Sequence, residues 1–95
     1  MNAWTGYLQR ERARHLEELK ELLRIPSVSS SSAHKKDVEA AARWVADALR
    51  RAGMEHVQVM ETGGHPVVYG DWLHAPGKPT ALIYGHYDVQ PAGPL

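Results

Sequence analysis

The fold of this chain is decided by the stretch KKDVEAAARWVADALRRA, residues 35–52, in which apolar side chains recur with the period of an α-helix. The repeat of three and four residues places these side chains on one helix face. The predicted face consists of Val38, Ala41, Ala42, Val45, Leu49 and Ala52, and is widened by Trp44 and Ala48. Gly53 follows, and glycine readily adopts the left-handed conformation that ends a helix. We therefore predict an amphipathic helix from Lys35 to Ala52.

A second helix is predicted on the N-terminal side of this stretch, over Tyr7–Arg24. Its leucines fall at positions 8, 16, 19, 22 and 23, and their spacing is helical from Leu16 onward. Pro26 ends this helix, because proline disfavours the α conformation of the residue before it. The serine-rich residues 27–32 then form a loop, since their hydroxyl groups compete for backbone hydrogen bonds.

Three strands are predicted on the C-terminal side, over His56–Glu61, Val67–Leu73 and Thr80–Tyr84. The first two are separated by a Gly-Gly-containing turn and form a hairpin. The third is a nearly continuous apolar run, which is typical of a strand covered on both faces. The fold class is therefore α/β, with two N-terminal helices followed by three strands. We expect the strands to begin a mixed sheet that is covered by helices and continues beyond this chain.

The composition limits the possible partners. Eleven basic and eleven acidic residues give a formal net charge of zero, which argues against a nucleic-acid or membrane partner. The chain has no cysteine, which excludes disulfides and thiolate metal sites and fits a cytoplasmic protein. Apolar runs of four residues or fewer predict no transmembrane helix.

The residues that could bind a metal or take part in catalysis lie in YGHYDVQP, residues 84–91, at the C-terminal end of the apolar run. Strand alternation would place His86 and Asp88 on the same side, with Cα atoms roughly 6.5 Å apart. The imidazole of His86 could then bind a metal, while the carboxylate of Asp88 orients the ring. A bare His-x-Asp pair at a strand end is, however, more often an ordinary hydrogen-bonded pair than a catalytic one.

The longer string carries more information. Residues 84–91 closely resemble the first metal motif of the di-zinc metallopeptidase family that includes carnosinase, aminoacylase-1 and glutamate carboxypeptidase. The stretch LKELLRIPSVS, residues 19–29, is similar to that family's opening helix and the loop after it. The second helix, Gly53 and the hairpin follow in the family's order. The sequence YDVQP, residues 87–91, points to the dipeptidase-like branch.

The resemblance implies that residues 1–95 form the N-terminal part of a metallopeptidase catalytic domain, which cleaves dipeptides or N-acyl amino acids. It implies Zn²⁺ as cofactor, two ions per active site, with His86 as a metal ligand and Asp88 as the adjacent catalytic carboxylate. The family supplies its other ligands from segments after this motif. We therefore expect the 95-residue chain alone to be inactive and to bind zinc weakly.

An alternative is a truncated, non-catalytic chain that folds or self-associates. We also expect a catalytic fragment to self-associate, because an uncovered apolar strand edge pairs readily with another chain. The other histidines match no metal-ligand spacing and are interpreted as exposed or structural residues: His15, His34, His56, His65 and His74. The serine-rich loop lacks the glycine pattern of a phosphate loop.

Overall fold

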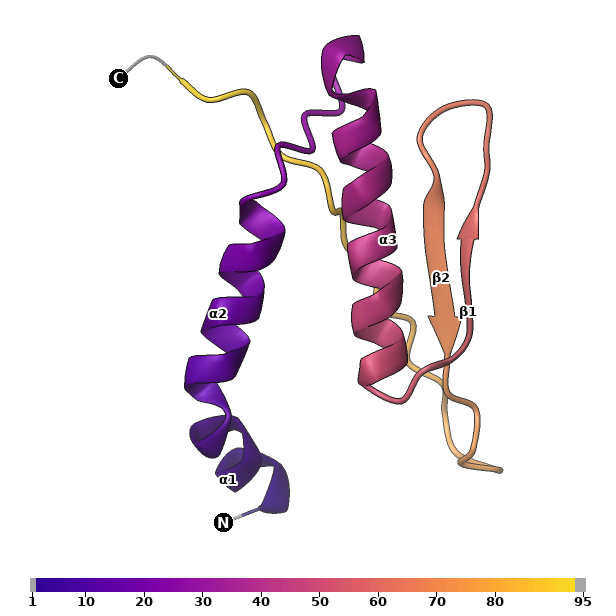
Figure 1. The fold of residues 1–95 in the computed structure, drawn as a ribbon. Helices are drawn as coiled ribbons and strands as arrows, with labels where there is room; N and C mark the ends of the chain where they lie inside the picture. The colour runs from indigo at the N-terminus through magenta and orange to yellow at the C-terminus, as the bar shows by residue number, and fades with distance from the viewer. Residues whose placement is uncertain (1, 94–95) are drawn as a thin grey trace.

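The computed structural model describes residues 2–93 and shows a mixed α/β arrangement (Figure 1). The elements are, in order, α1 (Ala3–Arg10), α2 (Arg12–Leu23), the short 3₁₀ helix η1 (Ser32–His34), α3 (Lys35–Arg51), β1 (Glu55–Met60) and β2 (Val67–Asp71). The two strands form one antiparallel sheet. No helix within residues 2–93 is long and apolar enough to cross a membrane.

The core lies between α3 and the β1–β2 hairpin, which run side by side in Figure 1. The buried apolar side chains of α3 are Val38, Ala41, Ala42 and Ala46. Val38, Ala41 and Ala42 belong to the predicted apolar face, so that part of the prediction is confirmed. At its C-terminal end, Val45 and Leu49 are only half-buried and Ala52 is exposed, because the helix ends before it.

Helix α3 ends as its sequence predicts. Gly53 has a φ of 92°, in the left-handed region that favours glycine. The Gly53 N–H donates to the carbonyl of Arg50, and the Met54 N–H donates to the carbonyl of Leu49, each at 3.0 Å. This pair of bonds is the Schellman motif, and it turns the chain from the helix into β1.

The hairpin confirms two of the three predicted strands. Val59 pairs with Val68 and Met60 with Val67, while the register shifts between Glu55 and Gln58. Val57 and Val59 are half-buried, whereas their neighbours along β1 are exposed. This alternation is the one that the sequence predicts. Strand β2 ends at Asp71 rather than at Leu73.

The single helix predicted over Tyr7–Arg24 is wrong in two respects. Helical structure begins at Ala3, and a φ of −99° and ψ of 8° at Glu11 divide it into α1 and α2. The division falls in a charged stretch between Leu8 and Leu16, where no buried side chain aligns the helix with a second layer. Polar contacts span the bend instead, because the Arg14 guanidinium donates to the Tyr7 hydroxyl and to the Glu11 carboxylate.

The third predicted strand, Thr80–Tyr84, is also wrong. These residues form no ladder, and the exposed fractions of Leu82, Ile83 and Tyr84 are 94%, 91% and 89%. A strand needs a neighbour to accept its backbone hydrogen bonds, and residues 2–93 supply none along this run. Outside the hairpin, the described chain has one isolated β-bridge, a parallel pair between Val28 and Val89.

We expect Gly70→Val to destabilise the contact between α3 and the hairpin. A Cβ atom at Gly70 would lie 3.3 Å from Val57 Cγ2 and 3.4 Å from Leu49 Cδ1. Overpacking of this kind costs about 1–3 kcal/mol. Urea unfolding followed by circular dichroism measures the change. Gly63→Val is the control, because nothing lies within 4 Å of a Cβ at Gly63. Equal stability of the two variants would contradict the packing described here.

Candidate metal centre

The motif at residues 84–91 is held by the loop that follows α2. The Val89 N–H donates to the Ser27 carbonyl at 3.0 Å, and the Ser27 hydroxyl donates to the Tyr87 carbonyl at 3.1 Å. Ser27 is fully buried, and Val28 forms the parallel bridge with Val89. The C-terminal end of the extended segment is therefore fixed, although its apolar run lacks a neighbouring strand.

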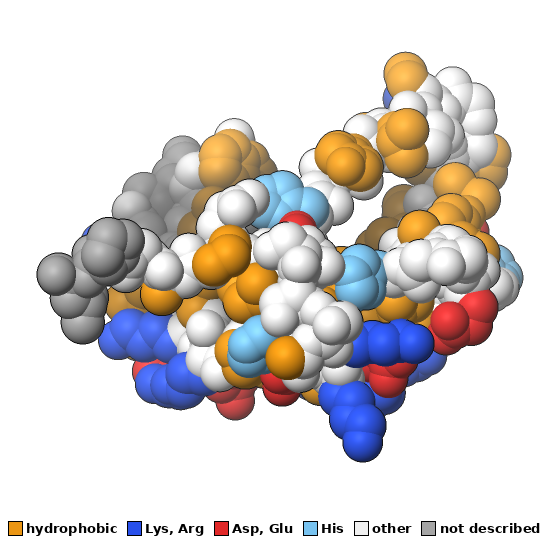
Figure 2. Space-filling model, turned by 90° about the horizontal axis from the view of Figure 1, so that it is seen from above, with side chains coloured by type: hydrophobic (Ala, Val, Ile, Leu, Met, Phe, Trp, Pro, Cys, Tyr) orange, Lys and Arg blue, Asp and Glu red, His pale blue; other side chains and the backbone are white. Residues whose placement is uncertain are grey.

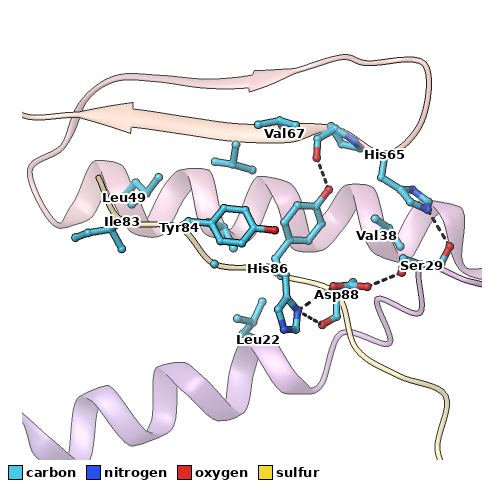
Figure 3. A pocket seen from close by; sticks show the side chains of 15 residues that line it. Leu22, Ser29, Val38, Leu49, His65, Val67, Ile83, Tyr84, His86 and Asp88 are labelled. Carbon is cyan, nitrogen blue, oxygen red and sulfur yellow. Dashed lines mark hydrogen bonds and ion pairs between the residues drawn. The ribbon is translucent and has the colours of Figure 1, made fainter. Parts of the chain in front are cut away.

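His86 and Asp88 lie on the same side of this segment, as their spacing predicts (Figure 3). The Nδ1 atom of His86 lies 2.9 Å from Asp88 Oδ1 and 3.2 Å from the Asp88 carbonyl oxygen. A carbonyl oxygen can only accept a hydrogen bond, so this geometry places the proton on Nδ1. The lone pair of Nε2 is then free, and the side chain of His86 is 78% exposed. This geometry suits an imidazole that ligates through Nε2.

The carboxylate of Asp88 is shared between two donors. Its Oδ1 accepts from His86, and its Oδ2 accepts from the Ser29 hydroxyl at 2.5 Å. The Ser29 hydroxyl, and after it the His86 ring, hold the pKa of Asp88 below its ordinary value. Asp88 is therefore ionised at neutral pH and suited to accept the Nδ1 proton.

The turn between β1 and β2 supports the same arrangement. The ring of His65 donates from Nε2 to the Ser29 carbonyl at 2.9 Å, and the Tyr87 hydroxyl donates to the Pro66 carbonyl at 2.6 Å. Partial burial raises the pKa of Tyr87, so its hydroxyl remains a donor at neutral pH. The serine loop, the hairpin turn and the motif thus form one connected network.

A pocket of about 650 Å³ lies beside this network. Apolar side chains from α2, α3 and the extended segment line much of it, among them Leu22, Val38, Leu49 and Ile83. Ser29, His65, His86 and Asp88 supply polar groups to the same pocket (Figure 3). Figure 2 shows histidines among hydrophobic side chains on one face, with most of the visible Lys, Arg, Asp and Glu side chains along its lower edge.

The side chains gathered here can supply one ligand to a metal ion, but they do not form a complete metal site. Within residues 2–93, no group of three or more His, Cys, Asp or Glu side chains is arranged to hold a metal ion. Zinc in a catalytic site takes about three protein ligands and an open position. His86 can supply one of them, with Asp88 as the group that orients its ring.

Other histidines are engaged away from this centre. His34 lies 2.8 Å from Asp37, His56 lies 2.7 Å from Asp71, and His74 lies 2.8 Å from Glu55. His15 packs beside the ring of Tyr7. Their interpretation as structural or exposed residues agrees with these contacts. His65 is exposed beside its turn, as expected, but it also touches the loop that supports Asp88.

The roles of Ser27 and Ser29 do not follow from the sequence. The sequence predicts only a loop over residues 27–32, whereas in the structure two of its serines bind the motif directly. These contacts join residues 59 and 60 positions apart, and no periodicity within one chain reports such a pairing.

Comparison with known proteins shows which enzymes this chain is related to. The chain is homologous to metallodipeptidases, which confirms the resemblance to the dipeptidase-like branch of the metallopeptidase family. Its relatives include the Cys-Gly metallodipeptidase DUG1 of Candida albicans, which is 36% identical over 81% of this chain. The cysteinylglycine-S-conjugate dipeptidase of Corynebacterium striatum is 33% identical over 85% of this chain. No protein-family model matches the chain.

A solved structure shares the fold. The dipeptidase Dug1p of Saccharomyces cerevisiae matches 90% of this chain with a TM-score of 0.82 and 27% identity. The matched regions are small parts of these relatives: this chain covers 18% of each of the two dipeptidases above and 20% of the solved structure. The chain thus spans about a fifth of the length of the proteins it matches.

Proposed function

We propose that this chain is the N-terminal part of the catalytic domain of a zinc-dependent dipeptidase, with His86 as a metal ligand and Asp88 as its catalytic carboxylate partner. The observation that carries the proposal is the hydrogen bond from His86 Nδ1 to Asp88, which leaves Nε2 free and exposed. Zinc histidines usually donate their second ring N–H to a carboxylate in this way. The homology to metallodipeptidases supports the same assignment.

The bound metal ions, two Zn²⁺ in this proposal, would generate a water-derived nucleophile and polarise the scissile carbonyl. The residues of this chain have a narrower task. His86 presents Nε2, and Asp88 keeps the ring proton on Nδ1. Ser29 keeps the Asp88 carboxylate in place. The adjacent pocket would lie beside the substrate, for which we propose dipeptides such as cysteinylglycine, or N-acyl amino acids.

The remaining ligands would come from residues outside this chain. His86 and Asp88 cannot complete a zinc site, and residues 2–93 offer no third side chain to them. The chain alone would therefore be inactive, and activity would require the other parts of a dipeptidase.

A chimera tests this proposal. The segment of S. cerevisiae Dug1p that matches this chain is replaced by this chain, and hydrolysis of Cys-Gly is measured with metal present. We expect the chimera to be active. Asp88→Asn should lower kcat/KM by about 10–100-fold, as loss of a ligand's carboxylate partner usually does. His86→Ala should lower it at least as much, because a ligand itself is lost.

His15→Ala is the matched control, because His15 lies on α2 and contacts Tyr7 rather than the motif. It should leave kcat/KM unchanged. Circular dichroism and gel filtration establish that each variant is folded. A folded His86→Ala chimera with undiminished activity would remove the ligand assignment.

The exposed apolar run favours a second property of the isolated chain, self-association. Leu82, Ile83 and Tyr84 are each about nine-tenths exposed, and their backbone lacks a ladder within the described residues. Such a segment is a template for pairing with another chain. We propose that the isolated chain pairs with a second copy there, whereas in a complete dipeptidase other strands would take that place.

Sedimentation at several concentrations measures this association. We expect the chain to sediment above its 10.6 kDa monomer mass as its concentration rises. Ile83→Lys should shift it toward monomer, because a charge in the pairing segment opposes association. Leu73→Lys is the control, since Leu73 is exposed but lies outside the segment. A 10.6 kDa species at all concentrations would contradict this proposal.

A further inference from the structure

We propose that Ser29 is a positioning residue, which acts through Asp88 to determine which nitrogen of His86 is free to bind a metal. This inference rests on the proposed function, because it assigns a role toward the same metal. It concerns Ser29 in the serine-rich loop, a residue to which the family resemblance assigns no role.

The two oxygens of the Asp88 carboxylate accept from two different side chains. The Ser29 hydroxyl donates to Asp88 Oδ2, while His86 Nδ1 donates to Asp88 Oδ1 (Figure 3). The side chain of Asp88 is 33% exposed, so without Ser29 its carboxylate could rotate toward water. With Oδ2 held by Ser29, Oδ1 remains directed at His86.

The position of Ser29 is itself fixed from two sides. The ring of His65, at the hairpin turn, donates to the Ser29 carbonyl at 2.9 Å. The preceding residue, Val28, pairs with Val89 of the motif itself. Because the backbone around Ser29 is held by the hairpin turn and by Val89 of the motif, its hydroxyl is a fixed donor to Asp88.

The consequence falls on the ring of His86. A neutral imidazole carries one proton, and the hydrogen bond made by one nitrogen determines whether the other is free to ligate. A carboxylate fixed at Nδ1 keeps the proton there and leaves Nε2 unprotonated. A mobile carboxylate would let the highly exposed ring exchange between its two tautomers. Ser29 therefore keeps Nε2 of the neutral ring unprotonated even when no metal is bound.

The tautomer of His86 can be observed directly. The full 95-residue chain, with ¹⁵N-labelled histidine, is studied by long-range ¹H–¹⁵N spectroscopy at about pH 8.5, well above the range in which a free imidazole takes up its second proton. In the unaltered chain we expect His86 to be protonated on Nδ1. Ser29→Ala should give a mixture of the two tautomers, and Ser29→Thr, which retains the hydroxyl, should restore the Nδ1-protonated form.

Ser27→Ala tests whether any loosening of the motif, rather than loss of the contact with Asp88, changes the His86 tautomer. The Ser27 hydroxyl binds the Tyr87 carbonyl and does not touch Asp88. We expect this variant to speed hydrogen exchange at the Val89 N–H while leaving the His86 tautomer unchanged. If Ser29→Ala keeps the Nδ1-protonated form, or if Ser27→Ala perturbs the tautomer equally, the positioning role is overturned.

The same substitution in the dipeptidase chimera connects the tautomer to catalysis. Ser29→Ala should lower kcat/KM by about 10–100-fold, with rescue by Ser29→Thr. The spectroscopic result needs neither metal nor activity. If the chimera that carries the unaltered chain is inactive, although Ser29→Ala changes the His86 tautomer in the 95-residue chain, the result counts against the proposed function. If that chimera is active and Ser29→Ala leaves the tautomer unchanged, the result counts against the role of Ser29.

Discussion

The attachment of the extended segment to the rest of the fold depends on Ser27. This residue is fully buried and uses both its hydroxyl and its carbonyl on the motif, toward Tyr87 and Val89. A hydrogen bond of this kind contributes about 0.5–1.5 kcal/mol net, but leaving a buried partner unsatisfied costs about 1–3 kcal/mol. The two bonds thus fix the backbone beside His86 and Asp88. Within the described residues, no strand ladder holds this segment.

The rest of the molecule divides into a packed part and an open part. Helix α3 and the hairpin share the buried alanines and Val38, and they hold the turn that carries His65. Helix α2 and the extended segment present large apolar side chains to solvent, including Leu16, Leu19, Leu23, Leu82 and Ile83. The pocket lies where these two parts meet, so the polar network borders apolar surface that a larger assembly could cover.

The sequence predicted those features that depend on neighbouring residues. The period of α3, the stop at Gly53 and the hairpin all follow from local chemistry, and so does the contact of His86 with Asp88 two positions later. The prediction failed at Thr80–Tyr84, because an apolar run becomes a strand only when another strand pairs with it. It also missed Ser29, whose contact with Asp88 spans 59 positions and depends on the folded loop.

In the structure, the ring of His86 is held by a carboxylate of the motif, so that its neutral form presents an accessible Nε2. Zinc titration of the ¹⁵N-histidine-labelled chain tests it most directly, because each of the six histidines reports separately. We expect zinc to bind weakly, with a dissociation constant above the micromolar range, and the first response to be a shift of the His86 Nε2 resonance. A first response at the other histidines, or none at His86 up to millimolar zinc, would contradict it.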